Sequence, residues 1–223
     1  MNGIGGRFQK ARYPIPKPFL TARGKTLLRW ALDSLPKDCE RIFIPRWEYI
    51  PYMEDYTRPQ DISIPITIDT RGPLETVLHA DQVVNGFLDS EDILIADCDA
   101  FFESPLEVTT GLRAFGKSIG GTWMRHSTDP MCAYAAVHDS YVLEVREKDP
   151  FTDTSLTGPY WWSSGNQFRK YGRKALTDGI VSIAPVYNGA IRDGNTVTCV
   201  EATTFQHLGS PAAYESFSHR TNL

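Results

Sequence analysis

The chain has 223 residues, a length that suits one sizeable domain with a single hydrophobic core. Hydrophobic residues make up 41% of the sequence and aromatic residues 12%, which argues for a folded protein and against disorder. A formal net charge of −4 provides no long-range attraction to nucleic acid, and no apolar run is long enough to span a membrane.

Apolar spacing in the first half of the chain predicts alternating helices and strands. Residues 25–35 place leucines on one helical face, and residues 73–87 begin with a proline at the first helical position. Short β-branched runs at 41–45 and 62–68 indicate strands, the second an edge or bulged strand because it contains a proline. Residues 92–97 are apolar and bounded by acids, as expected of a buried parallel strand. This alternation predicts an α/β sheet with helices on its faces.

The second half of the chain contains closely spaced strand candidates, which predict a small antiparallel addition to the sheet. The sequence offers one explanation for the pair Gly120 and Gly121, namely that another segment approaches the backbone closely there. The expected elements are strands at 119–124, 131–137 and 140–147, a strand running into a helix over 158–179, a helix at 184–194, a strand at 196–202 and a helix at 211–217.

Four cysteines are scattered along the chain without the Cys-x-x-Cys spacing of a zinc site: Cys39, Cys98, Cys132 and Cys199. This distribution favours reduced thiols in a cytosolic protein, and no secretory leader pattern is seen. We therefore expect a cytoplasmic protein, with neither a membrane nor a nucleic acid among its partners. The oligomeric state is left open, a homo-oligomer included.

The opening sequence MNGIGGRFQKARYPIPKPF has the composition of an anion-binding loop. Gly3, Gly5 and Gly6 allow positive φ angles, so successive backbone N–H groups can converge on phosphate oxygens. Arg7 offers two parallel donors to a phosphate, and Lys17 lies in a segment that its flanking prolines hold extended. From these residues alone, a flexible glycine-rich terminus beside a surface lysine is an equal alternative.

Two common nucleotide-binding motifs are absent from the sequence. The segment GIGGRF has Phe8 where a dinucleotide-binding fingerprint requires its third glycine. The GKT at residues 24–26 lacks the first glycine of a Walker A motif, since Phe19 takes that position. The five histidines show no HExxH spacing, so hydrolytic chemistry has no support either.

The segment ILIADCDAFF places Asp97 and Asp99 where a buried strand ends. Ligands of open α/β sheets bind beyond the carboxyl ends of the strands, and carboxylates there suit Mg²⁺ together with substrate phosphates. The alternative is that these acids cap the following turn or helix.

Two further segments have ordinary structural explanations. In EVREKDPF, the side chains of Glu147 and Lys148 would point to opposite faces of a strand. From these residues alone, a solvated strand end is the favoured explanation. In PYWWSS, Tyr160, Trp161 and Trp162 are better explained by packing than by a stacking platform for a ligand.

Taken in order, these segments resemble the sugar-nucleotidyltransferase-like superfamily. GIGGRF, PIPKPF and GKTLL are similar to its G-x-G-x-R, P-K-P and G-K-P-x-L elements. TRGPLETVLHA resembles its G-x-x-x-T-V-L segment, and LIADCDAFF resembles its strand ending in a metal-binding aspartate. EVREK, SLTGPYWW, APVYNGAIRDG and FQHLGSP resemble later landmarks, the last of them the closing G-T-P. The resemblance covers nearly the whole chain.

The resemblance implies a GT-A-like, Rossmann-related α/β fold. This fold has a mostly parallel mixed sheet flanked by helices, with a small antiparallel addition in the second half. It further implies a single nucleotidyltransferase-like domain over 1–223, in which 1–115 bind the nucleotide and 116–223 bind the acceptor and close the fold.

The implied reaction joins the NMP group of an NTP to a phosphorylated small molecule, most simply a sugar-1-phosphate, and releases pyrophosphate with Mg²⁺ as cofactor. A phosphate monoester is mostly dianionic at neutral pH because its second pKa is about 6, so it can attack phosphorus without a general base. Such a reaction needs positioning and cations. The resemblance assigns catalysis to Arg7 and Lys17, nucleotide binding to Gly3, Gly5, Gly6, Gly72 and Thr76, metal binding to Asp97 and Asp99, and acceptor binding to Glu147, Lys148 and Gly158.

Two features depart from the family pattern. Family members carry several apolar residues before the glycines, which form a central strand, whereas Met1 and Asn2 alone precede them here. We expect either a start upstream of Met1 or another segment in that position, because a missing central strand exposes unpaired backbone groups. Sugar-specific members often carry a metal-binding aspartate just before the closing element, where this chain has Gln206 and His207. The second metal ligand and a strict sugar-1-phosphate acceptor therefore remain open.

Three other functions are compatible with the sequence. Some relatives use CTP to activate phosphorylated amines or amino-acid derivatives. A GT-A glycosyltransferase would use Asp97 and Asp99 as a DxD motif, although the clamp for a leaving pyrophosphate argues against it. A non-catalytic nucleotide-binding module is the third.

Overall fold

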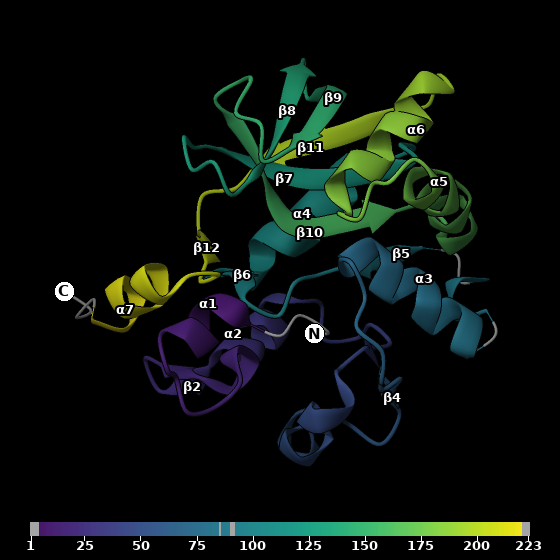
Figure 1. Ribbon diagram of the computed structural model, residues 1–223. Coiled ribbons are helices and arrows are strands. Elements are labelled where there is room, and N and C mark those ends of the chain that lie inside the picture. Colours follow the sequence, from purple (N-terminus) through teal and green to yellow (C-terminus); the bar gives the residue numbers. More distant parts are fainter. Residues whose placement is uncertain (1–4, 85, 90–91, 220–223) are drawn as a thin grey trace. The chain divides into compact units, whose positions relative to one another are not determined.

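The computed structural model describes residues 5–84, 86–89 and 92–219. They form a mixed α/β protein that divides into two compact units, each assembled from segments distant in sequence (Figure 1). Unit 1 comprises the described parts of 1–69, 97–108 and 204–223, and unit 2 those of 70–96 and 109–203. The single domain expected from the resemblance stays a prediction.

Unit 1 is made of short elements joined by irregular segments. Its main helix, α2, begins where the Thr26 side chain accepts a hydrogen bond from the Arg29 backbone N–H at 3.2 Å, and it ends just before Pro36. The elements of unit 1 are α1 Gly6–Lys10, η1 Lys17–Phe19, β1 Thr21–Ala22, β2 Lys25–Thr26, α2 Leu27–Ser34, β3 Ile42–Phe43, η2 Trp47–Tyr52, η3 Glu54–Tyr56, β4 Ile62–Ser63, β6 Ala100–Phe102, β12 Phe205–His207 and α7 Pro211–His219.

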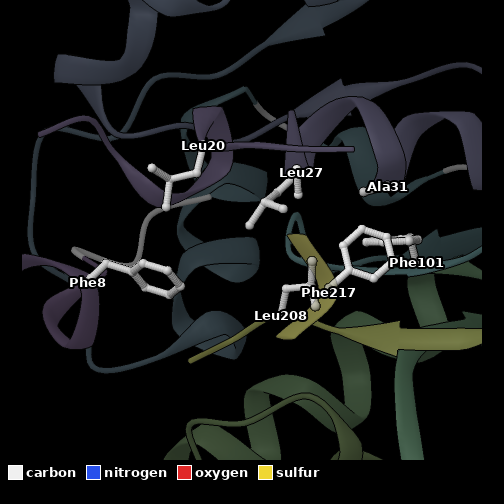
Figure 2. Packing of buried hydrophobic residues seen from close by; sticks show 8 residues of the cluster. Phe8, Leu20, Leu27, Ala31, Phe101, Leu208 and Phe217 are labelled. Carbon is white, nitrogen blue, oxygen red and sulfur yellow. The ribbon is translucent and has the colours of Figure 1, made fainter. Parts of the chain in front are cut away.

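A hydrophobic core joins the beginning, middle and end of the chain in unit 1 (Figure 2). Trp30 from α2 stacks on Phe101 from β6 with ring centroids 5.2 Å apart, and Phe217 from α7 meets both rings edge-on. Each fully buried side chain of this kind contributes roughly 1.5–3 kcal/mol. The buried members are Phe8, Leu20, Ala22, Leu27, Ala31, Phe101, Leu208 and Phe217.

Strands β6 and β12 pair antiparallel and bring residues about 100 positions apart into register, with His207 opposite Ala100. Next to this pair, the Glu107 carboxylate accepts hydrogen bonds from the Thr204 backbone N–H at 3.0 Å and from its hydroxyl at 2.6 Å. Neither β6, β12 nor helix α4 (Pro105–Phe115) was expected from the sequence.

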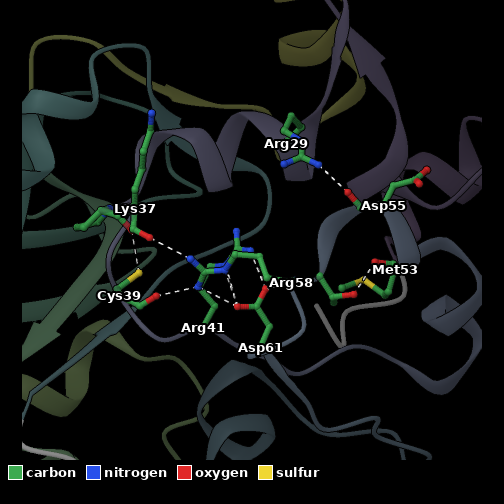
Figure 3. Close-up of polar contacts among 10 residues, drawn as sticks. Arg29, Lys37, Cys39, Arg41, Met53, Asp55, Arg58 and Asp61 are labelled. Carbon is green, nitrogen blue, oxygen red and sulfur yellow. Dashed lines mark hydrogen bonds and ion pairs between the residues drawn. The ribbon is translucent and has the colours of Figure 1, made fainter.

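A buried ion cluster fastens the parallel pair β3 and β4 (Figure 3). Arg41 contacts the Asp61 carboxylate through Nε at 3.2 Å and Nη2 at 2.6 Å. The Arg58 side chain also binds Asp61, and it donates to the carbonyl oxygens of Lys37 and Cys39. The two strands are shorter than expected because prolines remove backbone N–H donors from both runs.

Unit 2 is built on a six-stranded sheet with the order β5-β10-β7-β11-β9-β8. Strand β10 also pairs with β8, through Ser155 opposite Tyr134, so the sheet closes on itself. Helix α4 ends in this unit. The other elements are α3 Pro73–Val83, η4 Phe87–Asp89, β5 Ile93–Ile95, β7 Gly120–His126, β8 Ala133–His138, β9 Tyr141–Glu147, β10 Thr154–Trp162, α5 Gly165–Thr177, η5 Ala184–Val186, α6 Tyr187–Arg192 and β11 Val197–Glu201.

The mixed α/β class expected from the sequence is confirmed, but the described strands do not show the expected mostly parallel sheet. Only β7 and β11 pair in parallel within it, and β5 lies antiparallel to β10. The physical reason is clearest between β8 and β9. They are joined by Asp139 and Ser140, with φ of 49° and 68°, and such a two-residue turn connects only antiparallel strands.

Gly120 and Gly121 on β7 let aromatic rings pack against both faces of the sheet. A Cβ atom at Gly120 would lie 2.5 Å from the Tyr187 ring of α6, and one at Gly121 would overlap the Phe115 ring of α4. Successive residues of a strand face opposite sides, so these helices cover opposite faces. The expected close approach to the glycine pair is confirmed.

The packing expected of the tryptophans is confirmed. Trp161 and Trp162 are buried, and Trp162 stacks on Tyr187 with centroids 4.8 Å apart. All four cysteines are free thiols, of which Cys132 and Cys199 are buried. Across the described ranges, no helix combines the length and apolar character needed to cross a bilayer.

Candidate active site

A buried ion pair between Lys17 and Asp99 marks the candidate site in unit 1. The Lys17 Nζ lies 2.5 Å from the Asp99 Oδ2, and the two side chains are 20% and 10% exposed. Burial alone would raise the pKa of Asp99, but the Lys17 ammonium and the His207 imidazole hold it below its usual value. Burial opposes the charge on Lys17, and the Asp99 carboxylate more than offsets this, so the pKa of Lys17 is raised. Both groups are therefore charged at neutral pH.

The backbone on both sides presents this pair. Pro16 precedes η1 in an extended conformation, and the helical turn begins at Lys17. Asp99 stands immediately before β6, where its carbonyl oxygen accepts a hydrogen bond from the Leu208 N–H at 2.8 Å. The expected position of Asp99 after a strand is confirmed, since β5 ends at Ile95.

The opening segment reaches the same region through Arg7. Its Nη1 donates to the Gly209 carbonyl oxygen at 3.2 Å, which joins the two ends of the sequence. Gly5 adopts φ of +62°, and a Cβ atom there would lie 3.6 Å from the Lys17 Cβ. Phe8, 2% exposed, anchors the segment in the core. The expected loop is in part a helix, because α1 begins at Gly6 and the Phe8 and Gln9 N–H groups donate to the Gly5 carbonyl oxygen.

The structure thus brings Arg7, Lys17 and Asp99 into one small region of unit 1. Asp97 lies on the same segment as Asp99 with an exposed side chain. Gly3 lies outside the described residues, as does the segment before it, so its part in phosphate binding and the upstream start stay predictions. The roles of all these residues are likewise predictions.

His207 and Gly209 were not among the expected site residues. The His207 Nε2 lies 4.0 Å from the Asp99 Oδ2, and a Cβ atom at position 209 would lie 2.5 Å from that nitrogen. The sequence signal was the FQHLGSP segment, where Gln206 and His207 stood in place of an expected aspartate. Because side chains alternate along a strand, Gln206 points away from His207, and its amide donates to the Glu103 carboxylate at 2.8 Å.

Gly72 and Thr76 lie at the start of α3 in unit 2. A Cβ atom at Gly72 would lie 2.6 Å from the Val181 carbonyl oxygen, which requires glycine there. The Thr76 hydroxyl lies 2.6 Å from the Thr70 hydroxyl and donates to the Gly72 carbonyl oxygen at 3.1 Å. Both expected nucleotide-binding residues therefore have a structural role in this helix start.

Glu147 is the last residue of β9 in unit 2, and Lys148 follows it. Burial raises the pKa of Glu147, against the opposing effects of Lys148 and of a hydrogen bond with Ser182. Lys148 has φ of +55°, an unusual conformation for a residue with a side chain, and its Nζ lies 3.9 Å from the Glu147 Oε1. Gly158 is buried in β10, within the register shift between Leu156 and Tyr160. A plain solvated strand end does not explain a half-buried Glu147.

The donor chemistry at Asp99 suits a divalent cation. The Lys17 ammonium already places a positive charge against this carboxylate. Among the residues that the structure describes, no three or more His, Cys, Asp or Glu side chains gather to enclose a metal ion. An ion at Asp99 would therefore take its remaining ligands from water or from substrate phosphates, as Mg²⁺ commonly does.

No protein-family model and no curated protein sequence matches the chain. Solved structures match it over nearly its whole length. The nucleoside-diphosphate-sugar pyrophosphorylase from Vibrio cholerae RC9 has a TM-score of 0.81 at 22% identity, covering 98% of this chain and 97% of that one. The inositol-1-phosphate CTP transferase from T. maritima has a TM-score of 0.74 at 18% identity, covering 97% and 91%. A UDP-glucose pyrophosphorylase complexed with UDP-glucose has a TM-score of 0.71 at 14% identity, covering 97% and 94%. The chain has the fold of these proteins, as the resemblance implied.

Proposed function

We propose that this chain is a nucleotidyltransferase that transfers the NMP group of an NTP to a phosphorylated small molecule and releases pyrophosphate, with a sugar-1-phosphate as the leading acceptor. The observation that carries the proposal is the Lys17–Asp99 pair beside the Arg7–Gly209 contact. Three segments distant in sequence converge there, in a fold shared with a nucleoside-diphosphate-sugar pyrophosphorylase. A GT-A-like arrangement of the sheet and a cytoplasmic location belong to the same proposal.

The chemistry needs no proton transfer. An oxygen of the acceptor phosphate attacks the α-phosphorus of the NTP and forms a new P–O bond. The bond from the α-phosphorus to the oxygen bridging to the β-phosphate breaks, and its electron pair leaves with pyrophosphate. Because the acceptor is mostly dianionic above its second pKa of about 6, positioning and cations carry the catalysis.

Lys17 and Arg7 supply those cations. Lys17 is held at its ammonium by Asp99, so its position is defined before any phosphate arrives. In the proposed reaction it stabilises the charge that develops at the α-phosphate. Arg7 is exposed, and its Nη1 donates to a neutral carbonyl oxygen, a contact that leaves its positive charge available to the leaving pyrophosphate.

Asp99, with Asp97 two residues before it, would hold the Mg²⁺ expected for this reaction. When bound, such an ion neutralises charge on the phosphate oxygens. The protein's own contribution is to keep Asp99 ionised, which the low pKa of this carboxyl achieves despite its burial.

The residues of unit 2 are assigned to the base and the acceptor. The tight packing of Gly72 on Val181 supports a rigid backbone at the start of α3, where Gly72 and Thr76 would bind the base. Glu147, Lys148 and Gly158 would bind the acceptor, and the half-buried carboxylate of Glu147 suits hydrogen bonds from sugar hydroxyls.

A pyrophosphate-release screen tests the proposal. The common NTPs are crossed with sugar-1-phosphates, inositol-1-phosphate, phosphocholine and phosphorylated amino-acid derivatives, each with Mg²⁺ and with Mn²⁺ or Co²⁺. Pyrophosphate release that depends on both substrates is the expected result. In a parallel assay with UDP- and GDP-sugars, release of UDP or GDP would replace the proposal with a glycosyltransferase. NTP binding without turnover over the whole panel would replace it with a non-catalytic module.

A further inference from the structure

The side chain of Asn188 binds the backbone of β9 as a neighbouring strand would. Its Oδ1 accepts a hydrogen bond from the Val145 N–H at 2.8 Å, and its Nδ2 donates to the Val145 carbonyl oxygen at 2.7 Å. Within the described ranges, β11 pairs with β9 through Thr198 opposite Tyr141. Farther along the same edge, the two backbone groups of Val145 are therefore satisfied by an amide side chain in place of a strand.

The start of α6 gives Asn188 a rigid support. The preceding residue, Tyr187, is fully buried, and its hydroxyl lies 2.8 Å from the Gly121 carbonyl oxygen and 3.0 Å from that of Trp161. These contacts join the start of α6 to β7 and β10, and Asn188 joins the same helical turn to β9. One turn of helix therefore fixes β9 relative to two other strands of the sheet.

The strand end that Asn188 holds carries Glu147. Val145 and Glu147 are two residues apart on β9, so their side chains lie on the same face of the sheet. Val145 is buried, and burial also raises the pKa of Glu147, whose carboxyl has a hydrogen bond with Ser182. A displacement of Val145 would therefore move the Glu147 carboxyl out of this environment.

Both edges of β9 are needed to hold its last residues in place. On one edge, β8 pairs with β9 as far as Ala133 opposite Glu147. On the other edge, the Asn188 amide holds the backbone two residues before Glu147. A binding group must be placed precisely, because an error of about 1 Å can cost on the order of 10²-fold in rate.

We propose that Asn188 is a positioning residue for the acceptor, because its amide fixes the end of β9 and thereby the Glu147 carboxylate that binds the acceptor hydroxyl groups. This inference rests on the proposed function, since acceptor binding by Glu147 belongs to it. Asn188 acts through Glu147 and not on the reacting atoms. Its loss should therefore weaken acceptor binding and leave NTP binding intact.

Steady-state kinetics of Asn188→Ala test this role. The acceptor probe is glucose-1-phosphate, or whichever acceptor gives the highest rate in the pyrophosphate-release screen. We expect KM for the acceptor to rise by on the order of tenfold, with kcat lowered less than about threefold and KM for the NTP unchanged. An unchanged KM for the acceptor, or an equal rise of both KM values, would overturn the inference.

The matched control is Asn195→Ala. Asn195 lies beyond the C-terminal end of α6, and its Nδ2 donates to the Ala190 carbonyl oxygen and to the Tyr171 hydroxyl, each at 3.2 Å. It thus makes two amide hydrogen bonds, as Asn188 does, but to α5 and α6. KM for the acceptor should be unchanged in this control, and a rise equal to that of Asn188→Ala would overturn the inference.

A second variant guards against misfolding, which circular dichroism detects. Asn188→Asp keeps the shape of the side chain but replaces the donor to the Val145 carbonyl oxygen with an acceptor. It should also raise KM for the acceptor, and it decides the matter should Asn188→Ala fail to fold. An unchanged KM for the acceptor in folded Asn188→Asp would overturn the inference.

An NMR titration of the Glu147 carboxyl carbon tests the positioning without any substrate. Burial is the largest effect on this carboxyl and raises its pKa, against the opposing effects of Lys148 and Ser182. Asn188→Ala should therefore lower the pKa of Glu147 toward its ordinary value, and Asn195→Ala should leave it unchanged. An unchanged pKa of Glu147 in Asn188→Ala would overturn the inference.

The two readouts separate this inference from the proposed function. Pyrophosphate release with a KM for the acceptor that does not respond to Asn188→Ala would overturn the positioning role and leave the nucleotidyltransferase standing. A lowered pKa of Glu147 in Asn188→Ala, without pyrophosphate release for any substrate pair, would support the positioning of Glu147 and overturn the function.

Discussion

Asp61 and Asp99 are both buried carboxylates of unit 1, and each contacts a cation, at 2.6 Å and 2.5 Å respectively. They differ in how completely they are bound. Asp61 has a fully buried side chain and is held by the guanidinium groups of Arg41 and Arg58 and by a backbone N–H (Figure 3). Asp99 is 10% exposed and contacts a single strong cation, the Lys17 ammonium, with a backbone hydrogen bond and the His207 imidazole at 4.0 Å as weaker partners.

The difference separates a structural ion cluster from an exchangeable one. Two planar guanidinium groups bind several acceptor sites of a carboxylate in fixed geometry, whereas a lysine ammonium is a point charge on a flexible stem. A ligand that displaced either arginine side chain from Asp61 would have to break several hydrogen bonds at once. A metal ion that displaced the Lys17 ammonium from Asp99 would break one ion-pair contact and form another in its place. Buried charge alone therefore does not identify a functional site, and the form of its neutralisation is more informative.

The largest expected effect is on stability, at Asp61. Asp61→Asn removes the negative charge and leaves the guanidinium groups of Arg41 and Arg58 without compensation, so the free energy of unfolding should fall by about 3–5 kcal/mol. Urea denaturation followed by circular dichroism measures this change. Turnover per folded molecule should stay close to that of the unmodified protein. A loss below about 1 kcal/mol would show that the cluster is not a structural tie.

At Lys17 we expect the opposite, a large loss of turnover and a smaller loss of stability. Lys17→Ala removes a cation from the proposed reaction and should lower turnover about 10²–10³-fold. The free energy of unfolding should fall by roughly 1.5–3 kcal/mol, less than at Asp61, because Asp99 loses one charge-assisted hydrogen bond and keeps its other contacts. Pyrophosphate release under saturating substrate, beside urea denaturation, measures both. An unchanged rate would remove Lys17 from the mechanism.

The pH dependence of stability should follow Asp61. Burial opposes ionisation of this carboxyl, but hydrogen bonds from Arg41 and Arg58 more than offset it and lower its pKa to about 2 from 3.8. A folded-state pKa below the unfolded value stabilises the protein above the unfolded pKa, and that stabilisation is lost as the pH falls. The contribution should be roughly 2 kcal/mol and should disappear between about pH 4 and pH 2. Denaturation across this range should show a steeper loss in the unmodified protein than in Asp61→Asn, and parallel curves would contradict the prediction.

The smallest effect is expected at an exposed pair that matches Lys17–Asp99 in distance. The Lys25 Nζ lies 2.6 Å from the Asp33 Oδ2, with side chains 43% and 41% exposed. Lys25→Ala should change the free energy of unfolding by less than about 1 kcal/mol and leave turnover unchanged. The same two assays serve as the control for Lys17→Ala. A rate loss equal to that of Lys17→Ala would mean that net charge, not the position of Lys17, governs activity.

Local periodicity predicted the elements whose core faces lie within one segment. The helices at α2, α3 and α5 and the strands β7, β9 and β11 lie close to their expected positions, since each carries its own hydrophobic pattern. Helix α4 was missed although its residues have helical spacing. Strands β6 and β12 were missed because each has only three residues and its register depends on a partner about 100 positions away.

By itself the sequence determined the chemical inventory of this protein. It supplied a glycine-rich segment with Arg7, a lysine between prolines and a carboxylate after an apolar strand, and the order of these motifs predicted a mixed α/β fold of the nucleotidyltransferase kind, although not the observed sheet. Only the tertiary structure decided that His207 and Gly209, rather than Gln206, share the site with Asp99. That choice depends on strand register, because a shift by one residue turns a different side chain toward the site, and register is set by pairing between distant segments.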